Sequence, residues 1–539
     1  MALTTPPHNS LFARENYAGI EYGPLRPERR RRFPSKIIRK VIMKILLVYP
    51  AYPKTYWSFS YALKFVSKKA TFPPLGLLTV AALLPEQWEK RLVDMSVTPL
   101  SDRDLLWADY VLISAMAVQR DSVRAVLDRC QRLKVKTVAG GPLFTGQPEA
   151  YGDVDHLILN EGELTLPEFL RDLENGTPKR VYTSTGWADL STTPVPLWRL
   201  ASLKKYAALN IQYSRGCPFN CEFCNITALY GHTPRTKSAG QLLRELEAIY
   251  ATGWRGGVFF VDDNFIGNKH QLKQEILPAL LGWMRERRFP FSFQTEASIN
   301  LADDEELMGM MAEAGFNTVF IGIETPNEAS LAECNKLQNK NRDLLRCIRK
   351  IQGFGLEVQG GFIVGFDHDN ASIFKELTGF IQESGIVTAM VGLLNAPAGT
   401  RLYERLAGEG RIVSQMSGDN TDLSINFIPR MNRDALIKGY QQILDTIYAP
   451  KHYYDRVRTF LREYRPVKVR QARLHLCDIE AFFKSVVRLG IIGKERRYYW
   501  ELLLWSLFTR PGMFPMAVTL SIYGFHFRKV YRGYRLSRS

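Results

Sequence analysis

The sequence predicts an α/β fold with two parallel sheets and a mainly helical C-terminal domain. Two observations predict it: short apolar runs alternate with helix-length segments over residues 43–165 and again over 206–400, and the alternation stops after Thr400. At 539 residues, the chain is long enough for several folded domains. The expected order is a basic extension at 1–42, a Rossmann-like doubly wound domain at 43–165, a linker at 166–205, a partial (β/α)₆ barrel at 206–400 and the helical domain at 401–539.

The net charge of +17 is concentrated at the two ends of the chain. Residues 1–42 carry +6 and residues 451–539 carry +13, so the part between them sums to about −2. The extension lacks the apolar h-region of a signal peptide, and we expect it to be disordered. Met43 directly precedes the first strand, which allows an internal start site there. Basic ends suit an anionic membrane surface or nucleic acid, and solvated tails are the alternative.

The first alternation begins at Lys44. Strands are expected at residues 44–50, 91–94, 110–115, 136–141 and 156–160, with helices at 75–84 and 122–133. A doubly wound sheet binds its ligand beyond the carboxyl ends of the strands. Those ends carry Ser114-Ala-Met116, Gly140-Gly-Pro142 and Glu161-Gly-Glu163. Small residues there let the backbone approach a large flat ligand.

Three of the seven cysteines, Cys217, Cys221 and Cys224, fall within eight residues. Four thiolates normally hold a [4Fe–4S] cluster, so three would leave one iron open to a substrate. A structural zinc site needs four closed ligands, and the nearby candidate, His232, lies eight residues beyond the last cysteine. The remaining cysteines show no pairing pattern: Cys130, Cys334, Cys347 and Cys477. That usage fits a reducing cytoplasm.

The second alternation starts with a strand at 211–214 and surrounds the cysteines. Further strands are expected at 257–264, 291–296, 317–324, 356–365 and 387–394, with helices at 235–253, 269–288, 303–314, 342–353 and 371–384. Six βα units describe a partial barrel, in which chemistry is usually found at the carboxyl ends of the strands. Those ends carry Asp262, Asp263, Glu296, Glu324 and a group of glycines around the fifth strand.

The motif Cys-x-x-x-Cys-x-x-Cys, with Phe223 before its third cysteine, resembles the signature of the radical S-adenosylmethionine (SAM) enzymes. The resemblance implies a [4Fe–4S] cluster on Cys217, Cys221 and Cys224, with SAM on the open iron. The SAM contacts that it implies are Phe223, Asp262, Glu296, Glu324, Gly361 and Gly365. For each carboxylate the alternative is an ordinary salt bridge or helix cap.

The first domain, followed by this motif, resembles the cobalamin-binding domain of the cobalamin-dependent radical SAM enzymes. The cobalamin contacts that the resemblance implies are Leu75, Gly76, Ser114, Ala115, Met116, Gly140, Gly141, Glu161 and Gly162. Many cobalamin proteins supply a histidine to cobalt, but the corresponding loop after Asp94 has none, so we expect no protein histidine on cobalt. Another ligand, or an empty relic of the fold, is the alternative.

The resemblance implies a cobalamin-dependent radical SAM methyltransferase that acts on an unactivated carbon of a small molecule or lipid. One SAM would be cleaved to a radical that abstracts hydrogen, and a second would supply the methyl group through cobalamin. A reductase with flavodoxin or ferredoxin would donate electrons. The individual catalytic residues are not identified. One alternative is a cobalamin-dependent radical SAM cyclase or rearrangement enzyme.

A second alternative is a basic RNA-binding or RNA-modifying protein. The methylthiotransferases are the nearest such relatives, but they carry three further cysteines in the first domain, where this chain has only Cys130. No aromatic and basic nucleic-acid motif is present either, which argues against a nucleic-acid partner.

The C-terminal domain resembles that of a subset of these enzymes that includes the hopanoid methylases, which favours a terpenoid-like substrate. Its helix at 435–448 has one apolar face. Its apolar runs at 498–508 and 513–527 are shorter than the roughly 20 residues that cross a bilayer. They suit peripheral contact with the inner face of a membrane, or a helical lid on the barrel, in an otherwise cytoplasmic protein.

Overall fold

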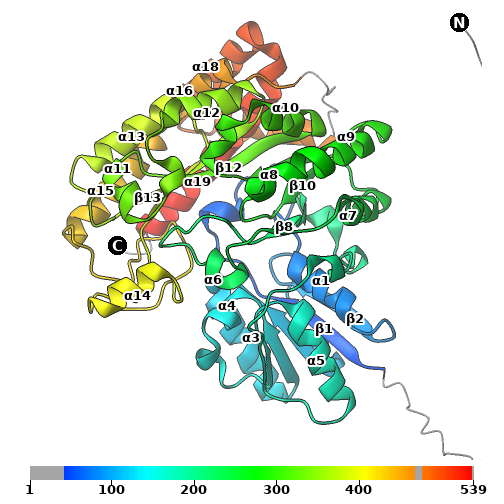
Figure 1. Cartoon of the computed structure of the whole chain (residues 1–539). Coiled ribbons are helices and arrows are strands. Elements are labelled where there is room, and N and C mark those ends of the chain that lie inside the picture. Colours follow the sequence, from blue (N-terminus) through cyan, green and yellow to red (C-terminus); the bar gives the residue numbers. More distant parts are fainter. Residues whose placement is uncertain (1–41, 468–475, 537–539) are drawn as a thin grey trace, which may run out of the picture. The chain divides into compact units, whose positions relative to one another are not determined.

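The computed structural model describes residues 42–467 and 476–536, which form two parallel sheets and a helical C-terminal part (Figure 1). This confirms the predicted fold class. Apart from Ile42, the predicted disordered extension lies outside the described residues.

The first sheet has six parallel strands in the order β2-β1-β3-β4-β5-β6. Its strands are β1 (Lys44–Tyr49), β2 (Glu89–Asp94), β3 (Tyr110–Ser114), β4 (Lys136–Gly140), β5 (His156–Ile158) and β6 (Val181–Tyr182). Its helices are α1 (Leu75–Leu83), α2 (Asp102–Trp107), α3 (Arg120–Leu133), α4 (Pro142–Gly146) and α5 (Gly162–Glu174). Apolar clusters cover both faces, as expected of a doubly wound sheet. The strand order reverses between β1 and β3, so the crevice beyond their carboxyl ends is the topological switch point.

The elements of the first sheet continue past the predicted domain boundary at residue 165. That boundary falls inside α5, whose Leu166 and Phe169 pack into the core of the first sheet. Strand β6 lies within the predicted linker and pairs with β5. The prolines at 167, 178, 194 and 196 predict an irregular segment. For this reason the sequence pattern does not predict the second half of α5 or strand β6.

The second sheet is parallel, with the order β14-β13-β12-β11-β10-β7, and its edges are β14 and β7. Its strands are β7 (Leu209–Ile211), β10 (Gly257–Phe260), β11 (Ser292–Glu296), β12 (Phe316–Glu324), β13 (Glu357–Val364) and β14 (Ala389–Leu393). Its helices are α6 (Ile226–Tyr230), α7 (Ala239–Ala251), α8 (Lys269–Gln271), α9 (Leu277–Glu286), α10 (Glu305–Ala314), α11 (Glu328–Glu333), α12 (Leu344–Gly353) and α13 (Ile373–Ser384). Sequential parallel pairing with open edges is the predicted partial barrel.

Two element boundaries near the cysteines differ from prediction. The strand expected at 211–214 ends at Ile211, and the next residues form β8 (Ser214–Arg215), which pairs antiparallel with β9 (Arg235–Thr236). The helix expected from Arg235 begins only at Ala239, because Ser238 forms a capping box with Gln241. The β8–β9 ribbon therefore closes the base of the loop that carries the cysteines.

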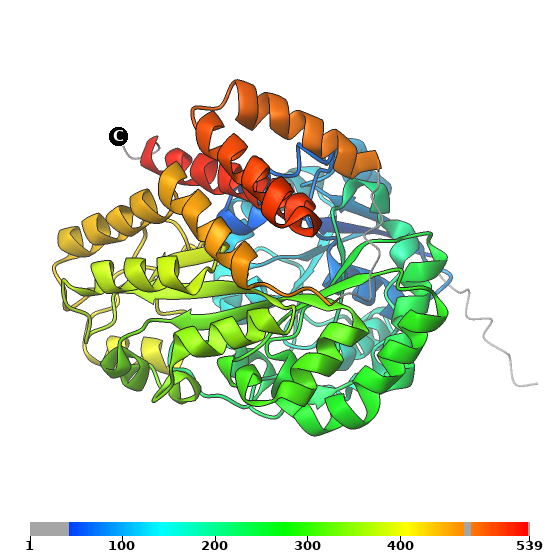
Figure 2. The ribbon, with the colours of Figure 1, turned by 90° about the horizontal axis from the view of Figure 1, so that it is seen from above.

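The C-terminal part is helical. Its helices are α14 (Arg401–Gly408), α15 (Arg433–Ile447), α16 (Pro450–Glu463), α17 (Leu476–Ser485), the π-helical η11 (Val486–Ile491), α18 (Arg496–Thr509) and α19 (Phe514–Leu536). Helix α19 also contacts the loop after β1, where Tyr56 stacks on Phe527 with ring centroids 4.3 Å apart. Figure 2 shows the orange and red helices of this part along one margin of the ribbon. In the described ranges, no helix combines the length and apolarity that a membrane span requires.

Candidate functional site

The three motif cysteines lie on one loop between β8 and α6. Cys221 is buried, and Cys217 and Cys224 are half-buried. Gly216 precedes them with φ +94°, and a Cβ there would lie 2.8 Å from the Thr233 carbonyl oxygen, so the loop needs glycine. Burial raises the pKa of the Cys217 thiol, and that of Cys224 to about 12. Binding to iron would therefore have to displace the thiol protons.

One buried ion-pair network joins the cysteine loop to the first sheet. Arg215 contacts Glu161 at 2.8 Å and Glu163 at 2.7 Å, and Arg235 contacts Glu161 at 3.0 Å. Glu161 also accepts the Ala188 N–H, so its carboxylate is engaged on all sides. We call these four charged residues the inner clamp, because Arg215 is only 12% exposed.

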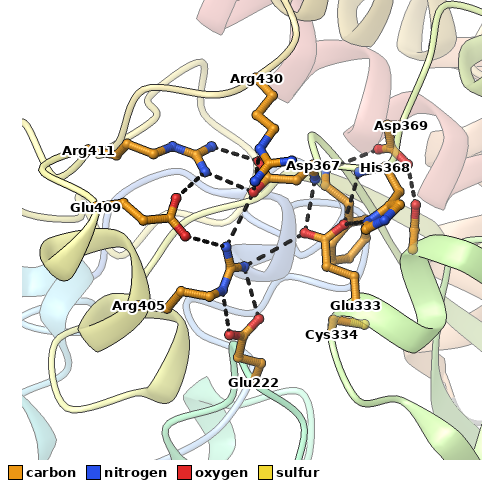
Figure 3. A network of polar contacts seen from close by, with 12 residues as sticks. Glu222, Glu333, Cys334, Asp367, His368, Asp369, Arg405, Glu409, Arg411 and Arg430 are labelled. Carbon is orange, nitrogen blue, oxygen red and sulfur yellow. Dashed lines mark hydrogen bonds and ion pairs between the residues drawn. The ribbon is translucent and has the colours of Figure 1, made fainter.

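A second network joins the same loop to the C-terminal part (Figure 3). Arg405 of α14 binds the Glu222 carboxylate with two hydrogen bonds, of 2.7 and 3.1 Å. It also pairs with Asp367 at 3.3 Å, and Arg411 pairs with Asp367 at 2.6 Å. We call Glu222, Arg405, Asp367 and Arg411 the outer clamp, because Arg405 is 30% exposed.

Asp262, at the end of β10, holds the start of the loop. Its carboxylate accepts the backbone N–H groups of Tyr213 and Ser214 and the Ser214 hydroxyl. Burial raises the pKa of Asp262 to about 7, although these hydrogen bonds lower it. Both oxygens are thus engaged by protein, whereas the next residue, Asp263, lines a cavity.

Glu324 forms a buried ion pair near the cysteines. Its Oε1 lies 2.8 Å from Nζ of Lys336, at a bulge where Glu324 has φ +64°. Burial lowers the pKa of Lys336, but the charges of Glu324 and Cys221 outweigh burial and raise it overall. A permanent ammonium therefore stands beside the thiols.

Asp263 and Glu296 form an acidic floor at the carboxyl ends of β10 and β11. Burial raises their pKa to about 6 and about 8, and for Glu296 the charges of Asp263 and Asp262 add to that rise. Asp263 accepts the Gly216 N–H. Across residues 42–467 and 476–536, neither carboxylate has an ion-pair partner.

Phe223 lies close to the end of β13. Its ring is 6.5 Å from that of Phe366, which directly follows Gly365. Gly365 has φ +109° and donates its N–H to Asp369, so it is a turn position. Packing explains why residue 361 is glycine, because a Cβ there would lie 2.8 Å from the Phe320 ring.

Two cavities adjoin between the sheets and share lining from α1, the end of β3 and Val261. The large cavity is about 1700 Å³ and reaches from Tyr49, Ala115 and Glu296 to α17 and α19. The small cavity is about 410 Å³. The predicted cobalamin contacts that line it are Leu75, Gly76, Ser114, Met116, Gly140, Gly141, Glu161 and Gly162. Ala115 lines the large cavity, so the structure brings all nine together.

The four glycines among the predicted cobalamin contacts differ in how much space surrounds each of them. A Cβ on Gly76 meets nothing within 4 Å, and one on Gly162 meets only Val80 at 3.8 Å. Gly140 is instead required by the Ile158 carbonyl oxygen, 2.6 Å from an added Cβ, and Gly141 by its φ of +89°. Gly76 and Gly162 are therefore the positions where added side chains would enter the cavity.

The charged partners Arg215, Lys336 and Arg405 were not predicted as site residues. Arg215 stands two residues before Cys217, and that position is the signal that could have identified it. Lys336 and Arg405 lie far from the motif in sequence and have no local signal. No three His, Cys, Asp or Glu side chains within the described ranges converge as ligands of a single metal ion. A cluster makes no such demand, because each thiolate binds a different iron.

Family models match the chain in three consecutive parts. The B12 binding domain matches residues 65–170, the radical SAM superfamily matches 211–381, and a domain of unknown function matches 400–538. The first two correspond to the two sheets, and the third to the helical part.

Two curated relatives cover most of the chain. An uncharacterized methyltransferase of Synechocystis is 39% identical over 90% of this chain and 91% of its own length. The hopanoid C-2 methylase of Rhodopseudomonas palustris is 33% identical over 85% of this chain and 86% of its own length.

Solved structures share the fold. The radical SAM methyltransferase TsrM from Kitasatospora setae, with cobalamin and a [4Fe–4S] cluster bound, aligns with a TM-score of 0.57 and 15% identity over 92% of this chain and 100% of its own. The cobalamin-dependent radical enzyme OxsB also gives 0.57 and 15%, over 92% of this chain and 81% of its own. The chain therefore belongs to the family of cobalamin-dependent radical SAM methyltransferases, whose cofactors are a [4Fe–4S] cluster, SAM and cobalamin.

Proposed function

We propose that this chain methylates an unactivated carbon of a large, apolar, terpenoid-like lipid. The observation that carries the proposal is the apolar lining of the large cavity. Its volume of about 1700 Å³ includes the crevice beyond β1 and β3, which Tyr49 and Ala115 line, so cobalamin and the substrate would share this cavity. Its wall is rich in aromatic side chains: Trp57, Phe59, Phe72, Trp254, Phe259, Phe320, Phe482 and Phe514. Such a wall suits a bulky hydrocarbon better than a charged metabolite.

We assign the cluster to Cys217, Cys221 and Cys224. Three thiols on one loop match the three thiolate ligands that such a cluster needs when one iron stays open. The Lys336 ammonium would offset the negative charge that a thiolate-bound cluster brings. Within this assignment, Lys336 is a positioning charge and not a ligand.

We assign the cationic groups of SAM to the acidic floor. Glu296 faces the large cavity and Asp263 the small one. A bound sulfonium or ammonium would give Glu296 the positive charge that it lacks. Burial raises the pKa of Asp263, but the charges of Arg215 and Arg235 already lower it. Phe223 and Gly365 lie together and could hold the adenine edge. Glu324, Asp262 and Gly361 would then support this region without direct contact, since each is engaged by protein.

We assign cobalamin to the crevice beyond β1 and β3, next to the small cavity. The open positions at Gly76 and Gly162 fit the close approach of a large flat ligand. No histidine is among the described residues that line either cavity, in keeping with cobalt that takes no protein histidine.

When bound, these cofactors supply hydrogen abstraction and a transferable methyl group. The chain's own residues would exclude water around the substrate and hold it between the floor and the first sheet. An external flavodoxin or ferredoxin with its reductase would supply electrons.

The test is anaerobic turnover of reconstituted protein with SAM and a polycyclic terpenoid lipid, followed by mass analysis. We expect a product that is heavier by one methyl group in place of a hydrogen, with two SAM consumed per product. A rearranged product without the added carbon would identify a cyclase or rearrangement enzyme. Turnover of a porphyrinoid but not of the lipid would contradict the assigned substrate class.

A further inference from the structure

The exposed apolar side chains of this protein are concentrated on one helical hairpin, residues 476–509. Of the eighteen large apolar side chains exposed in the described residues, nine belong to α17, η11, α18 and the turn between them: Ile479, Phe483, Val487, Ile491, Ile492, Trp500, Leu504, Leu507 and Phe508. Phe508 is 80% exposed. A monomeric soluble protein rarely exposes so many neighbouring apolar groups without a use for them.

These residues form stripes with helical spacing. Ile479, Phe483, Val487 and Ile491 follow one another every four residues along α17 and η11. On α18 the exposed residues are Trp500, Leu504, Leu507 and Phe508, which also share one face. The two stripes meet where the Trp500 indole donates a hydrogen bond of 3.0 Å to the Gly490 carbonyl oxygen. We call this surface the hairpin face.

Positive charge borders the hairpin face at the turn of the hairpin. Residues 476–509 contain five Lys and Arg against four Asp and Glu, but Glu495, the acidic residue within 488–497, is buried and pairs with Arg528 at 2.9 Å. Arg488, Lys494, Arg496 and Arg497 are exposed on the hairpin itself. Apolar side chains bordered by Lys and Arg are the pattern of a helix that lies in the interface of an anionic bilayer.

The hairpin face is continuous with the large cavity. Ile479 is 45% exposed and also lines that cavity, and its neighbours Ala481 and Phe482 line it from the same helix. Helix α19 adds Val518 and Ile522 to the same wall. Figure 2 shows these C-terminal helices side by side at one margin of the ribbon. A lipid that leaves a bilayer at this face would therefore meet the cavity mouth.

We propose that the hairpin face docks on an anionic lipid bilayer and admits the substrate from it into the large cavity. No described helix can span a membrane, so the contact is interfacial. Delivery of substrate depends on the proposed lipid methylation, but docking does not, and the two can fail separately.

The experiment is flotation of the full chain with cluster and cobalamin bound, using phosphatidylcholine vesicles with and without phosphatidylglycerol. We expect binding to the anionic vesicles that weakens in salt. The double variant Phe483→Ser/Phe508→Ser should bind about tenfold more weakly or worse, because each ring buries apolar area in the interface. Replacing Arg488 and Lys494 by Glu should weaken vesicle binding roughly fivefold for each unit of charge changed, and only on anionic vesicles.

The matched control is Leu106→Ser/Val413→Ser, which removes two exposed apolar side chains elsewhere, 62% and 59% exposed. Its binding should stay within about twofold of wild type. SAM cleavage without vesicles should be equal in all variants, which shows that each is folded.

Two outcomes would overturn docking. One is absence of vesicle binding by a protein that methylates the lipid in detergent micelles. The other is a dimer in solution that the Phe483→Ser/Phe508→Ser variant makes monomeric, with no change in vesicle binding. Binding to vesicles without lipid methylation would instead leave docking standing and contradict the proposed function.

Discussion

The cysteine loop and the acidic floor lie close together but balance their buried charges in opposite ways. At the loop, Arg215 meets Glu161 and Glu163, and Glu222 meets Arg405. At the floor, Glu296 has no cation in the described residues, and its pKa is raised. Removing one partner of a buried ion pair is strongly destabilising, so the paired groups of the loop hold one another in place, whereas the unpaired carboxylate costs stability unless a ligand supplies its counter-charge. The difference separates residues that build this site from residues that receive a ligand.

Breaking the inner clamp should give the largest effect. Arg215→Ala leaves Glu161 and Glu163 buried, 1% and 6% exposed, and Arg235 alone cannot pair with both. Breaking a buried pair in this way typically costs about 3–5 kcal/mol. We expect that loss in urea unfolding of the cluster-loaded protein. Arg103→Ala, at an exposed arginine on α2, is the control and should change stability by less than about 0.5 kcal/mol. Equal losses in both variants would contradict the role of the inner clamp.

Breaking the outer clamp should have a smaller effect. Arg405→Ala removes two charged hydrogen bonds to Glu222, but water reaches the remaining carboxylate more easily, so we expect about 1–2 kcal/mol. The cysteine loop should also release iron faster to a chelator. Arg430→Ala is the matched control, because Arg430 pairs with the same Asp367 at 3.4 Å but is 65% exposed. If this control releases iron as fast as Arg405→Ala, the contact between Arg405 and Glu222 is not what slows iron release from the cysteine loop.

Sequence patterns predict much of this comparison, but not its charge balance. The strands, the cysteine loop and Glu296 follow from periodicity and from the position of strand ends, which are local properties. Sequence patterns do not predict the ion pairs of Arg215, because its partners lie at the start of α5, more than fifty residues earlier. Asp262 and Glu296 look alike in the sequence, both at strand ends. Only tertiary contacts show that backbone N–H groups occupy the first while the second faces a cavity.

Replacing the unpaired carboxylate should affect binding and not folding. Glu296→Gln keeps the shape of the side chain and removes the charge, so we expect about tenfold weaker SAM binding by calorimetry, equal to about 1.4 kcal/mol, with no loss of stability. Glu357→Gln is the matched control. Glu357 is a buried carboxylate whose pKa burial likewise raises, to about 7, but it stands at the opposite, amino end of β13. Unchanged SAM affinity in Glu296→Gln would remove the floor from the SAM site.

The smallest expected effect is a pH dependence of the SAM-free protein to which Glu296 of the floor should contribute most. The folded pKa of Glu296, about 8, lies above the ordinary glutamate pKa of 4.5, so between these values the native state binds more protons than the unfolded state. Stability therefore falls as pH rises through this window, and Glu296 alone accounts for about 1 kcal/mol between pH 7 and 8. Asp263, with a pKa of about 6, has finished most of its titration there, whereas Asp262 and Glu357, both with a pKa of about 7, add roughly 0.3–0.4 kcal/mol each. In urea unfolding, Glu296→Gln should lose most of this slope, whereas Arg405→Ala should keep it at a lower stability. Saturating SAM should remove the same share of the slope in the wild type, because a cation at the floor keeps the Glu296 carboxylate charged throughout. A slope that persists undiminished in Glu296→Gln would mean that the titrating group lies elsewhere and that the floor is already neutralised without ligand.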